Sequence, residues 1–129
     1  MDLLLDTCIL IWWTNNPSKL SPKVNQLLID PKNSLFLSYV SVWEIQIKSQ
    51  LGKLELSLPI AKIVRDQQDT NDLQMLPIEL KHIYGLENLP HHHRDPFDRL
   101  IISQAIEKNI PILSSDSVFE KYSVQCIWK

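Results

Sequence analysis

Leu3-Leu4-Leu5-Asp6-Thr7 stands at the start of the chain and places three apolar residues in a row before an acid and a hydroxyl. The apolar run has no polar face, which is typical of a β-strand that is covered on both sides. The residues that follow, 7–13, have helical character. The chain therefore begins with a buried strand that leads directly into a helix.

Segments of strand and helix character alternate along the rest of the sequence. The clearest helix starts at Asp95-Pro96, where Phe97, Leu100, Ile101 and Ala105 fall on one face of a 3.6-residue period. This alternation predicts a single α/β domain over residues 1–129, with a mainly parallel sheet of five strands flanked by helices and right-handed crossovers. Further strands are predicted at 34–38, 74–78, 110–113 and 124–127, and further helices at 21–29, 41–50, 59–68, 79–84 and 115–122.

Composition is that of an ordinary globular protein, and several features indicate the cytoplasm. The only two cysteines, Cys8 and Cys126, lie far apart and in no C-x-x-C pattern, so we expect neither a structural disulfide nor a zinc site. Acids occupy the start of the chain, where a signal peptide would carry basic residues. The apolar run Ile9–Trp13 is too short to span a membrane.

The formal net charge of −2 does not by itself indicate a nucleic-acid partner. If four of the 15 acidic residues are metal ligands, however, the 13 basic residues face 11 acids. A bound divalent cation adds further positive charge at that site. The charge is therefore compatible with an RNA substrate without predicting one.

Four carboxylates stand out, and each has a purely structural explanation. Asp6 and Asp116 stand where a helix N-cap is expected. Glu44 completes the capping-box sequence Ser41-Val42-Trp43-Glu44. Asp98 lies in the first turn of its helix, where the macrodipole favours an acid. Taken singly, none of the four indicates a functional site.

Their positions relative to the predicted strands favour a shared site. Asp6 and Asp116 follow the first and fourth strands directly, and Glu44 and Asp98 each lie one turn into a neighbouring helix. In open α/β sheets, ligands bind beyond the carboxyl ends of the strands, so the four side chains can meet at one edge. Carboxylate oxygens suit hard cations such as Mg²⁺ or Mn²⁺.

Together these motifs resemble the PIN-domain family, and most closely the VapC-like toxins of bacterial toxin–antitoxin pairs. The resemblance covers essentially the whole chain, and its most specific part is the HRDPFDR run. It is carried by Leu3–Thr7, Ser41–Ile45 with Lys48 and Gly52, Leu89-Pro90, His93–Arg99 with Gln104-Ala105, and Ser114–Asp116.

The resemblance implies a sheet in the order 3-2-1-4-5 and a metal-dependent endoribonuclease. Asp6 and Asp116 then hold the principal Mg²⁺ or Mn²⁺ ion, with Glu44 and Asp98 contributing directly or through water. The implied partners are an RNA substrate, a cognate antitoxin that blocks the acidic groove and, as a homodimer, a second copy of the chain.

The sequence departs from the family pattern at two places. Ser114, which the resemblance makes a candidate substrate contact, stands where threonine is more usual, and Cys8 stands where related toxins often carry histidine. Neither departure concerns one of the four acids. The role of the side chain at position 8 is therefore open.

Other polar residues have two interpretations each. Arg94 and Arg99 either contact phosphate or pair with neighbouring acids, and Lys48 is either a substrate contact or the i,i+4 partner of Glu44. The run His91–His93 is interpreted as an exposed loop, with His93 near the substrate.

The tryptophans Trp12, Trp13 and Trp43 are expected in the core or at an interface rather than stacked on bases.

Two other functions share features with this sequence. A response-regulator-like signalling domain also has an acidic Mg²⁺ pocket, but it needs an aspartate after the third strand, and this chain has Pro77-Ile78-Glu79 there. A catalytically inactive RNA-binding domain of the same fold is the second alternative. The retained acids speak against it, because clustered carboxylates without a function would be unfavourable.

Overall fold

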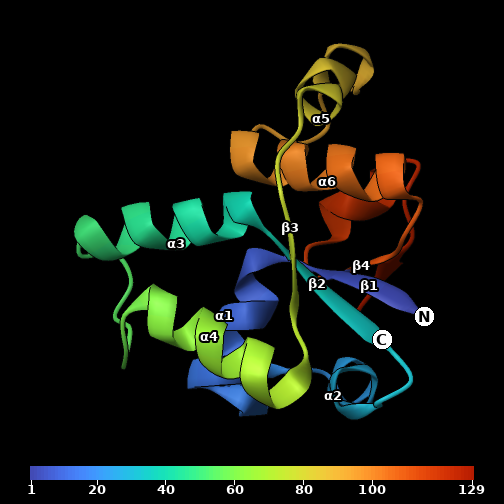
Figure 1. The fold of residues 1–129 in the computed structure, drawn as a ribbon. Helices are drawn as coiled ribbons and strands as arrows, with labels where there is room; N and C mark the ends of the chain where they lie inside the picture. Colours follow the sequence, from blue (N-terminus) through green and yellow to red (C-terminus); the bar gives the residue numbers. More distant parts are fainter.

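The computed structural model describes residues 1–129 and has a five-stranded sheet at its centre (Figure 1). All neighbouring strands are parallel, and their order is β3-β2-β1-β4-β5, so the predicted order 3-2-1-4-5 is confirmed. The strands are β1 (Asp2–Leu5), β2 (Ser34–Ser38), β3 (Gln74–Leu76), β4 (Ile112–Leu113) and β5 (Cys126–Ile127).

Helices cover both faces of this sheet, as Figure 1 shows. Helices α1, α2 and α4 lie on one side, α6 lies on the other, and α3 extends from the carboxyl end of β2. The α-helices are α1 (Thr7–Asn15), α2 (Pro22–Ile29), α3 (Tyr39–Gln50), α4 (Ile60–Asn71), α5 (Leu80–Tyr84) and α6 (Pro96–Lys108). The short 3₁₀ helices are η1 (Pro17–Lys19), η2 (Gly85–Asn88) and η3 (Ser117–Lys121).

β1 is the central strand, and its side chains enter two separate cores. Leu3 and Leu5 pack into the core that contains residues of α1, α2 and α4, whereas Leu4 packs into the core beneath α6. All three leucines are completely buried. The prediction of a strand covered on both faces is therefore confirmed.

α3 begins earlier than its sequence suggests. Ser38 is the N-cap, with its Oγ accepting a hydrogen bond from the Val40 amide at 3.0 Å. The predicted start at Ser41 is wrong, because Ser41 lies inside the helix and its Oγ accepts a hydrogen bond from the Thr7 hydroxyl at 2.9 Å. Glu44 is consequently not part of a capping box, and the structural explanation given for it fails.

Three strands and the last helix are shorter than predicted. The Ile110 amide bonds to the Ala105 carbonyl at the end of α6, so this residue closes the helix instead of opening β4. Pro77 has no N–H to donate, and β3 ends before it. β5 starts at Cys126 instead of 124. The segment predicted as a helix at 115–122 is the 3₁₀ helix η3.

The tryptophans divide between the core and the surface. Trp12 and Trp13 pack against the core of β1, and the Trp12 ring lies 5.9 Å from that of Trp128. Trp43 is 58% exposed and touches Phe97 edge-on, with ring centroids 5.2 Å apart.

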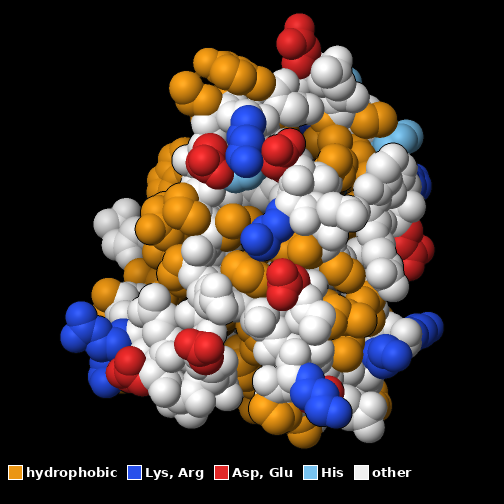
Figure 2. Space-filling view, turned by 45° about the vertical axis from the view of Figure 1, so that its right-hand side comes forward, with side chains coloured by type: hydrophobic (Ala, Val, Ile, Leu, Met, Phe, Trp, Pro, Cys, Tyr) orange, Lys and Arg blue, Asp and Glu red, His pale blue; other side chains and the backbone are white.

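Charged side chains are scattered over the face drawn in Figure 2, and basic groups there often lie near acidic ones. Surface lysines are also paired: Lys62 lies 2.9 Å from Asp66, and Lys81 lies 3.5 Å from Glu107. That face therefore has no continuous basic surface.

None of the helices is long and apolar enough to cross a bilayer.

The N-cap of α6 provides a test of the fold. Asp95 Oδ1 accepts hydrogen bonds from the Phe97 amide at 2.8 Å and the Asp98 amide at 3.3 Å. We expect Asp95→Ala to lower the free energy of unfolding by about 1 kcal/mol, and Asp95→Asn, which caps equally well, to leave it unchanged. Urea denaturation of the two variants measures the difference. Equal stability of Asp95→Ala and the wild type would contradict the cap.

Candidate metal centre

Asp6 and Asp116 are joined through Ser114 at the carboxyl ends of the neighbouring strands β1 and β4. The Ser114 hydroxyl donates to Asp6 Oδ2 at 2.8 Å, and its oxygen accepts from the Asp116 amide at 3.0 Å. Ser114 is completely buried. The pairing of β1 with β4 thus fixes these two acids relative to each other.

Asp6 is not a helix cap, although it occupies the N-cap position of α1. Its side chain makes no capping hydrogen bond and points instead to Ser114. The residue is only 6% exposed. A buried carboxylate that does not serve its own helix needs another explanation.

Asp98 and Asp116 converge on one histidine. His93 Nε2 lies 3.0 Å from Asp98 Oδ2 and 3.0 Å from Asp116 Oδ2. These three side chains form the cluster whose ligand atoms all lie within 4.8 Å of one another. Asp116 also caps η3, because its Oδ1 accepts from the Val118 amide at 3.0 Å. Its capping and its place in the cluster therefore coexist.

Glu44 reaches the same region from α3, and only one of its oxygens is compensated. The Lys48 ammonium lies 2.6 Å from Oε2, so Lys48 is the i,i+4 partner of Glu44. Oε1 is buried and has no hydrogen-bond partner. A buried carboxylate oxygen without a partner is unfavourable unless a cation or a water molecule binds it.

Burial and the neighbouring acids raise the pKa of two of these residues, Asp6 and Asp98. Burial, partly offset by hydrogen bonds from Ser114 and the Thr7 amide and reinforced by the charges of Glu44 and Asp116, raises the pKa of Asp6 to about 6. Burial, followed by the charge of Asp6 and of other nearby acids including Glu44 and Asp116, raises the pKa of Asp98 to about 8. The four acids therefore form one electrostatic unit, although Asp6 and Glu44 lie outside the three-residue cluster.

Cys8 lies at the edge of this unit. The thiol is exposed on one side, yet the protein packed around it, and then the charges of Asp6 and Glu44, raise its pKa to about 11. The side chain at this position is therefore a neutral thiol at physiological pH.

These donors fit a hard divalent cation. Carboxylate oxygens predominate, the acids repel one another, and Glu44 Oε1 has no partner of its own. Mg²⁺ and Mn²⁺ take oxygen ligands, and Mn²⁺ also tolerates imidazole nitrogen. From the sequence, His93 is expected only near the substrate. Its contact with both acids was not predicted, although it stands two residues before the cap Asp95.

The two candidate arginines differ in what they contact. Arg99 donates to the carbonyls of Pro90, Leu86 and Leu89 at 2.8, 3.4 and 3.3 Å, so it ties the preceding loop to α6. Arg94 is exposed and takes part in no hydrogen bond or ion pair of its side chain. Of these two arginines, only Arg94 is therefore free to contact a phosphate.

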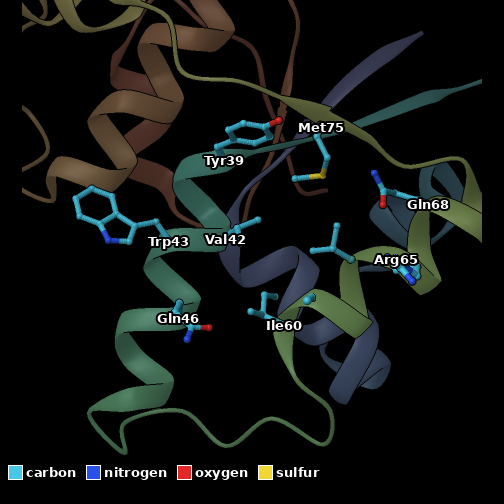
Figure 3. A pocket seen from close by; sticks show the side chains of 10 residues that line it. Tyr39, Val42, Trp43, Gln46, Ile60, Arg65, Gln68 and Met75 are labelled. Carbon is cyan, nitrogen blue, oxygen red and sulfur yellow. The ribbon is translucent and has the colours of Figure 1, made fainter.

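The largest cavity is separate from the acids. It is a groove of about 660 Å³ between α3 and α4, and its lining is mostly hydrophobic. Figure 3 shows Val42 and Ile60 facing this space from the two helices, with Met75 of β3 at its end. Because none of the four acids lines it, the groove does not provide the metal site.

The sheet order excludes the response-regulator interpretation. Flavodoxin-like signalling domains have the order 2-1-3-4-5, in which the third strand lies next to the first. Here β3 is an edge strand that pairs only with β2.

Comparison with solved structures gives the same fold at low sequence identity. VapBC2 from Rickettsia felis, bound to a DNA fragment from its promoter, matches with a TM-score of 0.75 and 18% identity, covering 100% of both chains. VapBC-1 from nontypeable Haemophilus influenzae matches with a TM-score of 0.62 and 20% identity, covering 98% of this chain and 97% of the other. VapBC-5 from Mycobacterium tuberculosis, of the VapBC family of toxin-antitoxin systems, has a TM-score of 0.62 and 18% identity, covering 99% and 98%.

Sequence comparison identifies the family. No curated protein matches the chain in sequence. The sequence pattern of the PIN domain, however, matches residues 3–125. Because this match spans nearly the whole sequence, the chain belongs to the PIN domain family.

Proposed function

We propose that this protein is a metal-dependent endoribonuclease toxin of the VapC type. The observation that carries the proposal is the convergence of Asp98 and Asp116 on His93, together with the buried and unpartnered oxygen of Glu44, whose charge acts on Asp98. Membership of the PIN domain family and the similarity to VapBC structures support it. The substrate we propose is RNA, which is cut at a phosphodiester bond.

In this proposal some residues of the chain bind the cation and others orient its ligands. Asp6 and Asp116 hold the principal ion, and Glu44 and Asp98 contribute directly or through water. Ser114 orients Asp6 by donating a hydrogen bond to Oδ2. A bound Mg²⁺ or Mn²⁺ supplies Lewis acidity, which lowers the pKa of a water molecule and offsets charge on the phosphoryl oxygens.

Two basic residues have different roles in this proposal. Arg94, exposed and next to His93, contacts the phosphate backbone of the RNA. Lys48 compensates Glu44, as the 2.6 Å contact indicates, and is not free to bind substrate while it does so. The positive charge for substrate binding thus comes from the cation and from Arg94.

An inactive RNA-binding domain is the alternative. A site that only binds RNA gains nothing from clustered acids, whose charges contribute to the raised pKa of Asp98, because they repel phosphate as well as each other. The cost of gathering these acids is explained if they bind a cation. RNA binding by the pure protein without cleavage, with Mg²⁺ or Mn²⁺ present, would favour the alternative.

We propose an antitoxin protein as the natural partner, covering the acidic site, and a homodimer as the assembly of the toxin in the cytoplasm. For the antitoxin, support comes from the neighbours, one of which is a toxin-antitoxin complex from Klebsiella pneumoniae. Co-expression with the product of an adjacent short reading frame, followed by light scattering of the complex and of the toxin alone, tests both partners.

Cleavage assays test the metal mechanism. The protein should cut RNA with Mg²⁺ or Mn²⁺ and lose this activity in excess EDTA. Asp6→Asn, Asp98→Asn and Asp116→Asn should each slow cleavage by more than about 100-fold, since even outer partners of metal ligands contribute about 10–100-fold. Asp95→Asn is the matched control from the same motif and should stay active. Full activity in EDTA, or an inactive Asp95→Asn beside an active Asp98→Asn, would contradict the proposal.

The raised pKa values predict how stability in EDTA changes with pH. The folded protein keeps protons on Asp6 and Asp98 up to about pH 6 and 8, whereas the unfolded chain loses them near 3.8. At a pH above 3.8 and below these raised pKa values, the folded protein therefore binds more protons than the unfolded chain. Raising the pH from 5 to 8.5 removes these protons and should lower the free energy of unfolding.

The matched variant for this test is Asp98→Asn. It should lose less stability over the same pH range, and its melting temperature should fall by at least about 3 °C less than that of the wild type, as expected for about 1 kcal/mol. Thermal melts at both pH values measure this. Added Mn²⁺ should stabilise the wild type more at pH 8.5 than at pH 5, because protons compete with the cation. Equal pH dependence of both proteins would argue against the clustered acids.

The two arginines can be separated experimentally. Arg99→Ala should lower the free energy of unfolding by about 1–3 kcal/mol, because three loop carbonyls lose a charged donor. Arg94→Ala should fold normally but bind RNA more weakly, with the salt dependence of log Kd reduced by about one unit of slope. Thermal melts and RNA binding at several salt concentrations check both. A destabilised Arg94→Ala with unchanged RNA affinity would refute its assignment.

A further inference from the structure

His93 occupies the one point at which acids from two separate segments meet. Its Nε2 lies 3.0 Å from Asp98 Oδ2 in α6 and 3.0 Å from Asp116 Oδ2 before η3. The side chain is only 15% exposed. Two functions are compatible with this place: the nitrogen binds the cation, or its hydrogen holds the two carboxylates.

The other ring nitrogen distinguishes the two functions. His93 Nδ1 accepts a hydrogen bond from the Asp95 amide at 3.2 Å, so the hydrogen of the ring is on Nε2. A metal-bound histidine has the opposite arrangement, in which the nitrogen away from the ion donates to a carbonyl or a carboxylate. The backbone at Asp95 therefore makes Nε2 a donor toward the two carboxylates.

The surroundings of His93 fix the ring in this position. The His93 amide donates to the Tyr122 hydroxyl at 2.7 Å, and Tyr122 is 6% exposed. The ring also packs against Phe119 of η3, with centroids 5.7 Å apart. Phe119 of η3 and Tyr122 thus hold the Nε2–H of His93 between the carboxylates of Asp98 and Asp116, which would otherwise repel each other.

We propose that His93 is a positioning residue of the metal centre: its Nε2–H holds Asp98 and Asp116 together so that their oxygens face a common cation. Each carboxylate oxygen has more than one lone pair, so an oxygen that accepts this hydrogen bond still has a lone pair for the cation. This inference rests on the proposed metal site. It gives His93 a role in cation affinity and none in contact with RNA.

The test uses Mn²⁺ as the probe and the full chain, without any RNA. Electron paramagnetic resonance of free Mn²⁺ gives the affinity, and the spin-echo modulation of bound Mn²⁺ reports whether an imidazole nitrogen is coordinated. The variants are His93→Ala, His93→Gln, whose amide also donates a hydrogen bond, and His91→Ala, the matched control at an exposed position of the same loop.

We expect His93→Ala to bind Mn²⁺ about 10–100-fold more weakly, as for other outer partners of metal ligands. His93→Gln should recover much of that loss, and His91→Ala should bind like the wild type. The spin-echo modulation of the wild type should show no directly bound nitrogen. A purely structural role would not give this combination of weaker Mn²⁺ binding and rescue by an N–H donor.

Three results would overturn the inference. A nitrogen coupling in the wild type that His93→Ala abolishes makes His93 a ligand. Unchanged or tighter Mn²⁺ binding by His93→Ala shows that the hydrogen bonds do not support the site. A wild type that binds no Mn²⁺ refutes both the positioning role and the proposed metal-dependent function. If His93→Ala does not fold, the wild-type spectrum and the Mn²⁺ affinity of His93→Gln still distinguish a positioning role of His93 from a ligand role.

Discussion

Burial of β1 between two layers of helices is the constraint on which the rest of the structure depends. Leu3 and Leu5 enter one core and Leu4 enters the other, so this strand cannot move to an edge without exposing one of them. The central position gives β1 two parallel neighbours, β2 and β4. Because parallel strands end at the same edge of the sheet, Asp6 lies at the edge where the other acids converge.

The energetic problem at this edge is to hold several acids close together within the protein. The chain solves it by giving each of the four acids a polar partner for one of its carboxylate oxygens. Ser114 donates to Asp6, Lys48 pairs with Glu44, and His93 bridges the remaining two acids. The one buried oxygen that these partners leave out is Oε1 of Glu44, which marks where a further positive charge is required.

Sequence patterns predicted the elements well where local chemistry alone sets them. Asp95-Pro96 marks the start of α6 because a cap and a proline are local signals, whereas the start of α3 was misplaced by two residues. Both Ser38 and Ser41 are plausible caps, and only the tertiary contact of Ser41 with Thr7 distinguishes them. The sheet order came from the resemblance to a family, because periodicity does not specify which strands are neighbours.

The contacts of His93 show most clearly what a sequence does not reveal. Two of its partners, Asp95 and Asp98, are close in the chain, but Asp116 and Tyr122 lie more than twenty residues away. Consecutive histidines in a polar run are typical of an exposed loop, and that interpretation is right for His91 and His92. His93 differs from them because Phe119 of η3 packs against its ring and its Nε2 contacts two acids.

Two effects of opposite sign act on Asp98, and their balance bears on whether this acid serves its own helix. At the third position of α6 the helix dipole favours the charged form, by about 0.3–1 kcal/mol, which is less than one pKa unit. Burial and the neighbouring acids favour the protonated form, and their effect is larger, since the pKa of Asp98 rises to about 8. An acid kept only for the dipole would lie in solvent and have a lowered pKa. Asp98 instead points inward to the other acids, and helix stability does not account for its position.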